Sequence, residues 1–144
     1  MFSKSCEYGL KAIIYIATES LGDNRVKIGD VANKTGTPEA FTAKILGTLV
    51  RHDILQSRKG PHGGFEIELD RMKEIKISEI VAAIDGDAIY KGCALGLDEC
   101  SATDPCPMHD SFISIRNELR KMLESTSIYD LAQKFKSGKT TLLR

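Results

Sequence analysis

The chain has no surplus of charge of either sign. Its 144 residues include 20 lysines and arginines and 20 aspartates and glutamates, so the formal net charge is zero at pH 7. A protein that coats nucleic acid regardless of sequence carries a large basic excess, and this balance argues against that class. The charges are unevenly spread, because basic residues predominate over positions 44–62 and acidic residues over positions 85–110. We expect the first region to face an anion.

The chain also lacks a long hydrophobic run. The apolar stretch at residues 12–17 is far shorter than the roughly 20 residues that span a bilayer, and no charged segment precedes it as in a signal peptide. Internal repeats and low-complexity segments are absent as well. We therefore expect a cytoplasmic protein with no membrane partner. In that compartment, clustered cysteines bind metal or sense redox state more often than they form disulfides.

Motifs of the common enzyme classes are missing. There is no Cys-x-x-Cys pair, no phosphate-binding glycine loop and no catalytic base at a fixed spacing from a nucleophile. A thiol oxidoreductase that uses Cys106 is the one enzyme that the cysteines would allow, and turnover of a disulfide substrate would reveal it. We predict that the protein is not an enzyme.

Hydrophobic residues recur at helical spacing through the first fifty positions and predict three helices. The first spans about residues 5–20, and the second is a short helix that ends before Gly36. The third begins at Thr37-Pro38-Glu39, where threonine is expected to cap the helix and proline to take its first position. It runs to about Arg51. Two short helices joined by a glycine-containing turn indicate a helix-turn-helix.

The third helix is expected to have two distinct faces. Phe41, Ile45 and Leu49 should form its buried face. The opposite face carries small residues, which let the helix backbone approach base edges closely, together with two cations. We predict that DNA contacts on this helix come from Thr37, Ala40, Ala43, Lys44 and Arg51.

Two strands follow the third helix, at residues 54–58 and 65–69. The second alternates, with Phe65, Ile67 and Leu69 expected on one face. A helix-turn-helix followed by a hairpin with a basic tip is a winged helix. At the tip, Arg58, Lys59 and His62 suit a minor groove or a backbone phosphate.

A solvated helix and an ordinary hairpin are the alternative to this interpretation. Each feature taken singly favours that alternative, but their order along the chain favours binding to a double-stranded DNA operator.

The rest of the chain is predicted to be helical apart from one loop. A fourth helix over about residues 77–84 is closed by Gly86, and Ser127 with Asp130 caps a short last helix. Between them, apolar residues step by four and three along a long helix, which is the pattern of a two-stranded seam. We predict that this helix forms a homodimer through Met108, Phe112, Ile115, Leu119 and Met122.

These elements predict a mostly α fold with a small β-hairpin, in which a winged helix-turn-helix is joined to a long C-terminal dimerisation helix. We expect a DNA-binding domain at 1–86 and a cysteine-rich, cluster-binding loop at 87–106. The dimerisation helix and a short closing helix should occupy 107–136. Residues 137–144 show no pattern and are expected to form a flexible tail.

Three of the four cysteines lie close together, in the pattern Cys93-x6-Cys100-x5-Cys106-x2-His109. Soft ligands that are near in sequence gather around a metal with little loss of chain entropy. Cys106 is expected at the N-terminus of the long helix, where the dipole favours thiolate, with His109 near the same face. Such a set suits zinc or an iron–sulfur cluster, and its loose spacing favours the cluster.

Free buried thiols in a mobile loop are the alternative to a metal site. Cys6 stands apart from the other cysteines and is interpreted as a small packing residue.

The sequence resembles the winged-helix iron–sulfur regulators typified by IscR and NsrR, from Tyr8 to about Phe135. Five short motifs carry the resemblance, two of them quite specific: the wing and the cysteine pattern. The motifs are Glu7-Tyr8-Gly9-Leu10, Arg58-Lys59-Gly60-Pro61-His62-Gly63-Gly64-Phe65, Ile77-Ser78-Glu79-Ile80, Cys106-Pro107-Met108-His109 and Thr126-Ser127-Ile128-Tyr129-Asp130-Leu131.

The resemblance implies a homodimeric transcription regulator whose cluster controls DNA binding. Cys93, Cys100 and Cys106 match the three cluster cysteines, and His109 matches the fourth ligand of the IscR type, which holds a 2Fe–2S cluster. In the NsrR type the fourth ligand is a carboxylate from the first helix of the partner subunit, the cluster is 4Fe–4S, and Glu7 occupies that position here. We favour His109, because Cys106-x2-His109 is the IscR pattern.

The sequence departs from the IscR pattern at three places. The first gap between cysteines is one residue longer than usual, Ala43 stands where a base-reading acid is usual, and Lys59 stands where arginine is usual. The operator sequence is therefore left open.

We predict a regulator whose operator binding is controlled by an iron–sulfur cluster that senses cluster status, redox state or nitric oxide. A zinc-stabilised winged-helix module that binds another protein, without a sensing role, is the alternative. Visible absorption distinguishes them, because zinc is colourless and a cluster is coloured.

Overall fold

Most helices begin and end within a few residues of the positions that hydrophobic periodicity predicts. A computed structural model describes all residues, 1–144, as a mostly α fold with one antiparallel hairpin. In chain order, the elements are α1 (Lys4–Leu21), α2 (Ile28–Thr35), α3 (Glu39–Arg51), β1 (Gln56–Arg58), β2 (Gly64–Glu66), α4 (Leu69–Glu74), α5 (Ile77–Asp85), α6 (Ala88–Lys91), α7 (His109–Ser125) and α8 (Ile128–Lys136). None of the helices combines the length and hydrophobicity that a membrane span requires.

The first helix is the centre of the hydrophobic core. α1 packs against α2, α3, α5 and α8, and its buried face includes Ile13 and Ile16. The same core includes Leu123, Ile128 and Ala132 from the C-terminal helices. The last helix therefore packs with the winged helix, although it follows the long helix in sequence. The division of the chain into four segments stays a prediction.

A buried residue of α8 provides a test of this shared core. Ile128 is fully buried, and its backbone N–H donates to the Ile75 carbonyl at 3.0 Å. Replacing Ile128 with alanine should lower the free energy of unfolding of the whole chain by about 3 kcal/mol, because it leaves a cavity in the common core. Chemical denaturation followed by circular dichroism measures the loss. Leu69→Ala is the control, and an equal loss in both variants would contradict the assignment.

Two predicted placements of apolar side chains are wrong: Phe41 was expected to be buried, and Leu69 was expected on a strand beside Phe65 and Ile67. Phe41 on α3 is 45% exposed and meets the Tyr8 ring edge-on, with centroids 5.8 Å apart. Leu69 is 48% exposed, because the chain leaves the hairpin after Glu66 and turns into α4, with Glu68 as the N-cap. The strands are accordingly shorter than predicted. The alternation around Phe65 gave no sign that a helix begins at Leu69.

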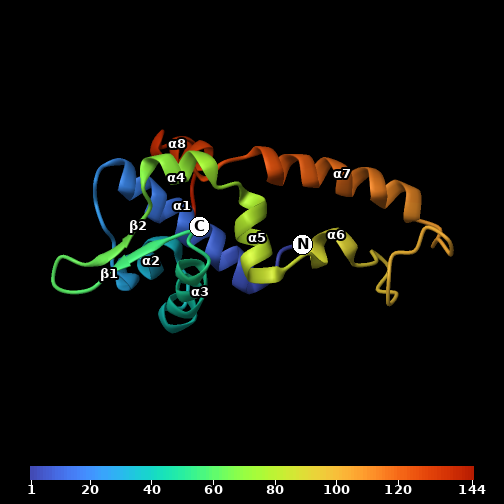
Figure 1. Cartoon of the computed structure of the whole chain (residues 1–144), viewed down its shortest axis with the longest axis horizontal. Helices are drawn as coiled ribbons and strands as arrows, with labels where there is room; N and C mark the ends of the chain where they lie inside the picture. The colour runs from blue at the N-terminus through green and yellow to red at the C-terminus, as the bar shows by residue number, and fades with distance from the viewer.

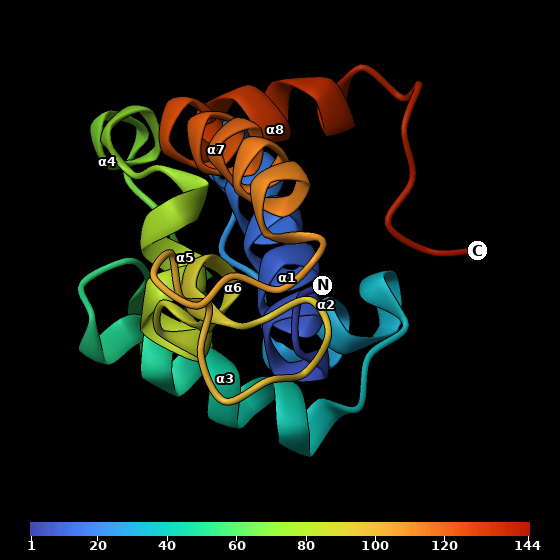
Figure 2. The same cartoon turned by 90° about the vertical axis from the view of Figure 1, so that its right-hand side faces the viewer.

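The wing and the cysteine loop lie at opposite ends of the molecule. Figure 1 shows the hairpin of β1 and β2 at one end and α7 extending to the other, with α6 and the loop of residues 92–108 below it. Viewed along that direction, the loop folds across the near end of the molecule, and the chain after α8 runs back beside α2 (Figure 2). The helical body therefore lies between the loop and the wing.

Candidate functional site

One face of α3 packs on the core and the opposite face is open to solvent. Thr42, Ile45, Leu46 and Leu49 are buried against the core, so α3 has one possible exposed side. Ala40, Lys44 and Arg51 lie on that side, and Ala43 is half-buried at its margin. Lys44 takes part in no ion pair, whereas the Arg51 guanidinium donates to the Thr48 hydroxyl at 3.0 Å.

Thr37 does not cap α3 and is not on the exposed face. The helix begins at Glu39 with Pro38 as its N-cap, and Thr37 is buried. Its hydroxyl accepts from Thr42 at 2.8 Å and bonds to Thr35 at 2.9 Å. These hydroxyls satisfy one another inside the turn of the helix-turn-helix, which explains why Thr37 is drawn inward. We correct its predicted role to a structural one.

The wing turn is set by glycine. A Cβ on Gly63 would lie 2.2 Å from the Arg58 carbonyl oxygen, and one on Gly64 would lie 2.7 Å from the Val26 carbonyl oxygen. No residue with a side chain fits at either position. The turn therefore holds Lys59 and His62 at the exposed tip, and Lys59 is free of any ion pair.

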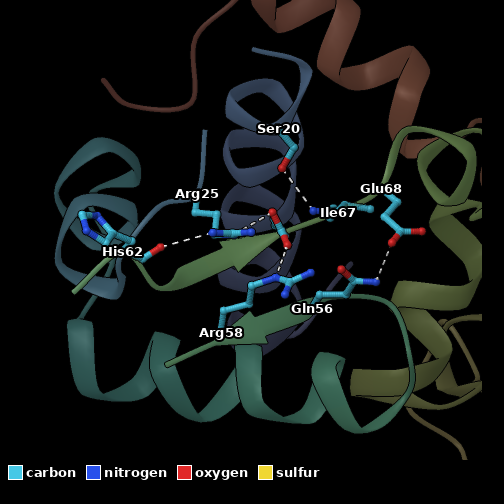
Figure 3. A network of polar contacts seen from close by, with 8 residues as sticks. Ser20, Arg25, Gln56, Arg58, His62, Ile67 and Glu68 are labelled. Carbon is cyan, nitrogen blue, oxygen red and sulfur yellow. Dashed lines mark hydrogen bonds and ion pairs between the residues drawn. The ribbon is translucent and has the colours of Figure 1, made fainter. Parts of the chain in front are cut away.

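Arg58 is not a free cation. Its Nε donates to the Glu66 carboxylate at 2.7 Å, and the Nε of Arg25 donates to the same carboxylate at 2.9 Å (Figure 3). The two guanidiniums, Arg58 above all, hold the pKa of Glu66 below its usual value. Sequence reasoning missed Arg25 and Glu66, because the three residues are distant in sequence and no local pattern pairs them.

The cysteine loop brings its predicted ligands near one another in two pairs. Cys100 Sγ lies 3.4 Å from Nδ1 of the buried His109, and the Cys106 side chain lies near enough to Cys93 to help lower the pKa of the Cys93 thiol. A cavity of about 450 Å³ adjoins Cys100 and His109. No group of three or more histidine, cysteine, aspartate or glutamate side chains is arranged to hold a metal ion. The donor types fit a metal or cluster, but binding requires the two pairs to come together.

The surroundings of Cys93 and Cys6 shift the pKa values of their thiols in opposite directions. The Leu95 N–H donates to Cys93 Sγ at 3.4 Å, and such backbone bonds lower the pKa of this thiol. Burial, with Asp85 nearby, raises the pKa of Cys6 to about 12. Cys6 is therefore a packing residue, as the sequence suggested. All four cysteines are free thiols.

One predicted feature of the loop is placed differently by the structure. Cys106 lies before α7 and not on it, because the helix begins at His109 with Met108 as its N-cap. The His109 N–H donates to the Cys106 carbonyl at 3.0 Å, so the two residues are still linked. Glu7 is on the first turn of α1, where it forms an ion pair with Lys4 at 3.0 Å.

The long helix leaves an apolar stripe uncovered. Only His109 and Leu123 of α7 are buried. Met108, Ile115 and Met122 are exposed, and Phe112 and Leu119 are half-buried, so all five predicted seam residues lie on or beside the uncovered side. A contiguous exposed apolar stripe on a soluble helix is typical of a surface that another protein covers.

A family profile matches almost the whole chain. It is the profile of the Rrf2 family, described as iron-dependent transcriptional regulators, and it matches residues 2–134. A candidate HTH-type transcriptional regulator of Aquifex aeolicus is 32% identical over 134 residues, which cover 91% of this chain and 90% of the relative. IscR of Photorhabdus laumondii is 23% identical over 124 residues, 86% of this chain and 74% of the relative.

Solved structures share the fold. CymR of Bacillus subtilis, described as its global cysteine regulator, superposes with a TM-score of 0.74 at 20% identity, covering 93% of this chain and 97% of CymR. IscR of T. potens superposes with a TM-score of 0.71 at 16% identity, covering 98% of this chain and 92% of IscR. These likenesses confirm the predicted winged-helix fold.

Proposed function

The chain belongs to the Rrf2 family of transcriptional regulators, and from this premise we propose that it binds an operator as a homodimer under control of an iron–sulfur cluster. It is a winged-helix DNA-binding regulator and not an enzyme, like its relatives. In the proposal, Cys93, Cys100, Cys106 and His109 hold a 2Fe–2S cluster. The protein acts in the cytoplasm, where thiols stay reduced.

The contact between Cys100 and His109 is the observation that carries the cluster proposal. Two soft ligands nine positions apart meet at 3.4 Å beside a cavity, and the remaining two thiols lie in the same loop. Neutral imidazole and thiolate together suit iron, and a bound cluster would supply a redox-responsive centre at this place.

The position of the loop suggests how the cluster state reaches DNA. The loop ends at the start of α7, to which it is linked through the Cys106 carbonyl and the His109 N–H. Ordering the loop would fix the first turn of α7, and in a dimer α7 sets the spacing of the two copies of α3. Control then requires that the two loop states favour different dimer geometries.

Anaerobic purification tests the cofactor directly. We expect iron and acid-labile sulfide in equal amounts and visible absorption. Equal iron and sulfide with a 4Fe–4S spectrum would favour a Glu7 ligand from the partner. Colourless protein with stoichiometric zinc would instead favour the zinc-stabilised module.

The DNA contacts are tested by removing the two lysines among the predicted contact residues, neither of which forms an ion pair. Lys44→Ala and Lys59→Ala should each weaken operator binding, because each loses a charge on the reading surface. Where the lost contact is to phosphate, the slope of log affinity against log salt should fall by about one unit. Fluorescence anisotropy over a salt series measures both quantities.

Lys121→Ala is the matched control for these variants, because Lys121 is an exposed lysine on α7. If both reading-surface variants bind like the control at every salt concentration, DNA lies on another face.

A further inference from the structure

Three sets of contacts attach the wing to the helical body. The backbones of Val26 and Phe65 exchange two hydrogen bonds, at 3.1 and 2.8 Å. The Ile67 N–H donates to the Ser20 hydroxyl at 3.1 Å. Arg25 bonds to Glu66 and also to the His62 carbonyl at the wing tip, at 3.4 Å (Figure 3).

Glu66 is the common partner in the third contact. Its side chain is only 22% exposed and faces two guanidiniums, one from the loop between α1 and α2 and one from β1. An isolated surface ion pair contributes little, but one carboxylate shared by two arginines fixes the relative position of three segments. Arginine suits this role, because the donors of its planar guanidinium have a fixed geometry, whereas the ammonium group of lysine can rotate freely.

We propose that Arg25, Glu66 and Arg58 are positioning residues that set the direction of the wing relative to α3. Arg58 then helps to orient the wing, while the unpaired charge of Lys59 at the tip is available to contact DNA. The position of the wing decides which phosphates and groove edges the tip can reach once α3 occupies the major groove. The inference rests on the proposed operator binding and adds a determinant of specificity to it.

The direction in which Glu66→Gln changes the affinity for DNA distinguishes a positioning role from a simple effect of charge. Glu66→Gln removes an acid from a DNA-binding surface, which by charge alone would strengthen binding to every duplex. If Glu66 positions the wing, affinity for a cognate duplex should fall about fivefold while affinity for a scrambled duplex rises. The cognate duplex is one that the wild-type protein enriches from a random-sequence pool, and the scrambled duplex has the same length and composition.

Arg25→Ala supplies the second measurement. As a positioning residue it should lower cognate affinity about fivefold and leave the salt slope unchanged, because no phosphate contact is lost. Arg71→Ala is the matched control, since Arg71 also binds a carboxylate and a backbone carbonyl, but on α4. Thermal melts of all three variants verify that each is folded.

Two outcomes would overturn the inference. One is that Glu66→Gln strengthens binding to both duplexes equally, in which case the residue only screens charge. A fall of about one unit in the salt slope of Arg25→Ala would make Arg25 a direct phosphate contact. Failure of the wild-type protein to enrich any sequence would instead overturn operator recognition itself, before the variants are compared.

Discussion

The double variant Ile115→Glu, Met122→Glu is expected to sediment as a monomer. The two side chains are 60% and 49% exposed, so they do little for the fold of a single chain. In a dimer they would lie in an apolar seam, where an uncompensated buried charge costs about 3–5 kcal/mol. Because a two-fold axis duplicates each change, the interface would receive four such charges.

Leu119 is a poor choice for this experiment, although the heptad pattern includes it. It packs against the core cluster, so a charge there would weaken the single chain as well as the dimer. Ser114→Glu combined with Lys121→Glu is the better control, because both residues are exposed on α7 away from the predicted seam and neither lines the cavity beside Cys100 and His109.

Sedimentation velocity and operator affinity are the two measurements for the seam. The seam variant should be monomeric and should bind the operator weakly, while the control should resemble the wild-type protein. A seam variant that remains dimeric would show that another surface joins the subunits.

The amphipathic helices could be predicted from sequence because their signal is local. Repeated apolar spacing placed α1, α2 and α5 within a few residues, and the capping box of Ser127 and Asp130 placed the start of α8. Each of these features depends on neighbours within about one turn.

The errors arise where distant contacts decide the outcome. Thr37 resembles a helix cap, but its hydroxyl is taken by Thr35 and Thr42 in a buried turn. Sequence reasoning also missed the partner of Arg58. Glu66, eight positions after Arg58, binds both Arg58 and Arg25, which lies 41 positions before Glu66. No periodicity or motif reports such pairings, because they are set by the register of the hairpin and its bridge to Val26.

His109→Ala is expected to weaken cluster retention at least about tenfold, whereas Glu7→Ala should leave the visible spectrum nearly unchanged. The imidazole Nδ1 already lies 3.4 Å from Cys100 Sγ within one chain. The Glu7 carboxylate is engaged by Lys4 on α1 and would have to reach the loop of a second chain. Iron and sulfide analysis after anaerobic gel filtration measures retention.

His109 is buried, so its loss could also weaken the start of α7. His109→Cys removes this ambiguity, because it keeps a soft ligand at the same position. This variant should retain the cluster but lower its reduction potential, since a thiolate replaces a neutral imidazole. His52→Ala is the matched control, because His52 lies at the end of α3 and bonds to the Thr48 carbonyl.

The opposite pattern would assign the fourth ligand to the partner subunit. In that case Glu7→Ala would lose the cluster and His109→Ala would keep it, and mixing Glu7→Ala chains with Cys100→Ala chains would give dimers with at most one intact site. Retention of iron in both variants would exclude both residues. The contact between Cys100 and His109 would then be a packing contact, and the fourth ligand would have to come from another residue or from solvent.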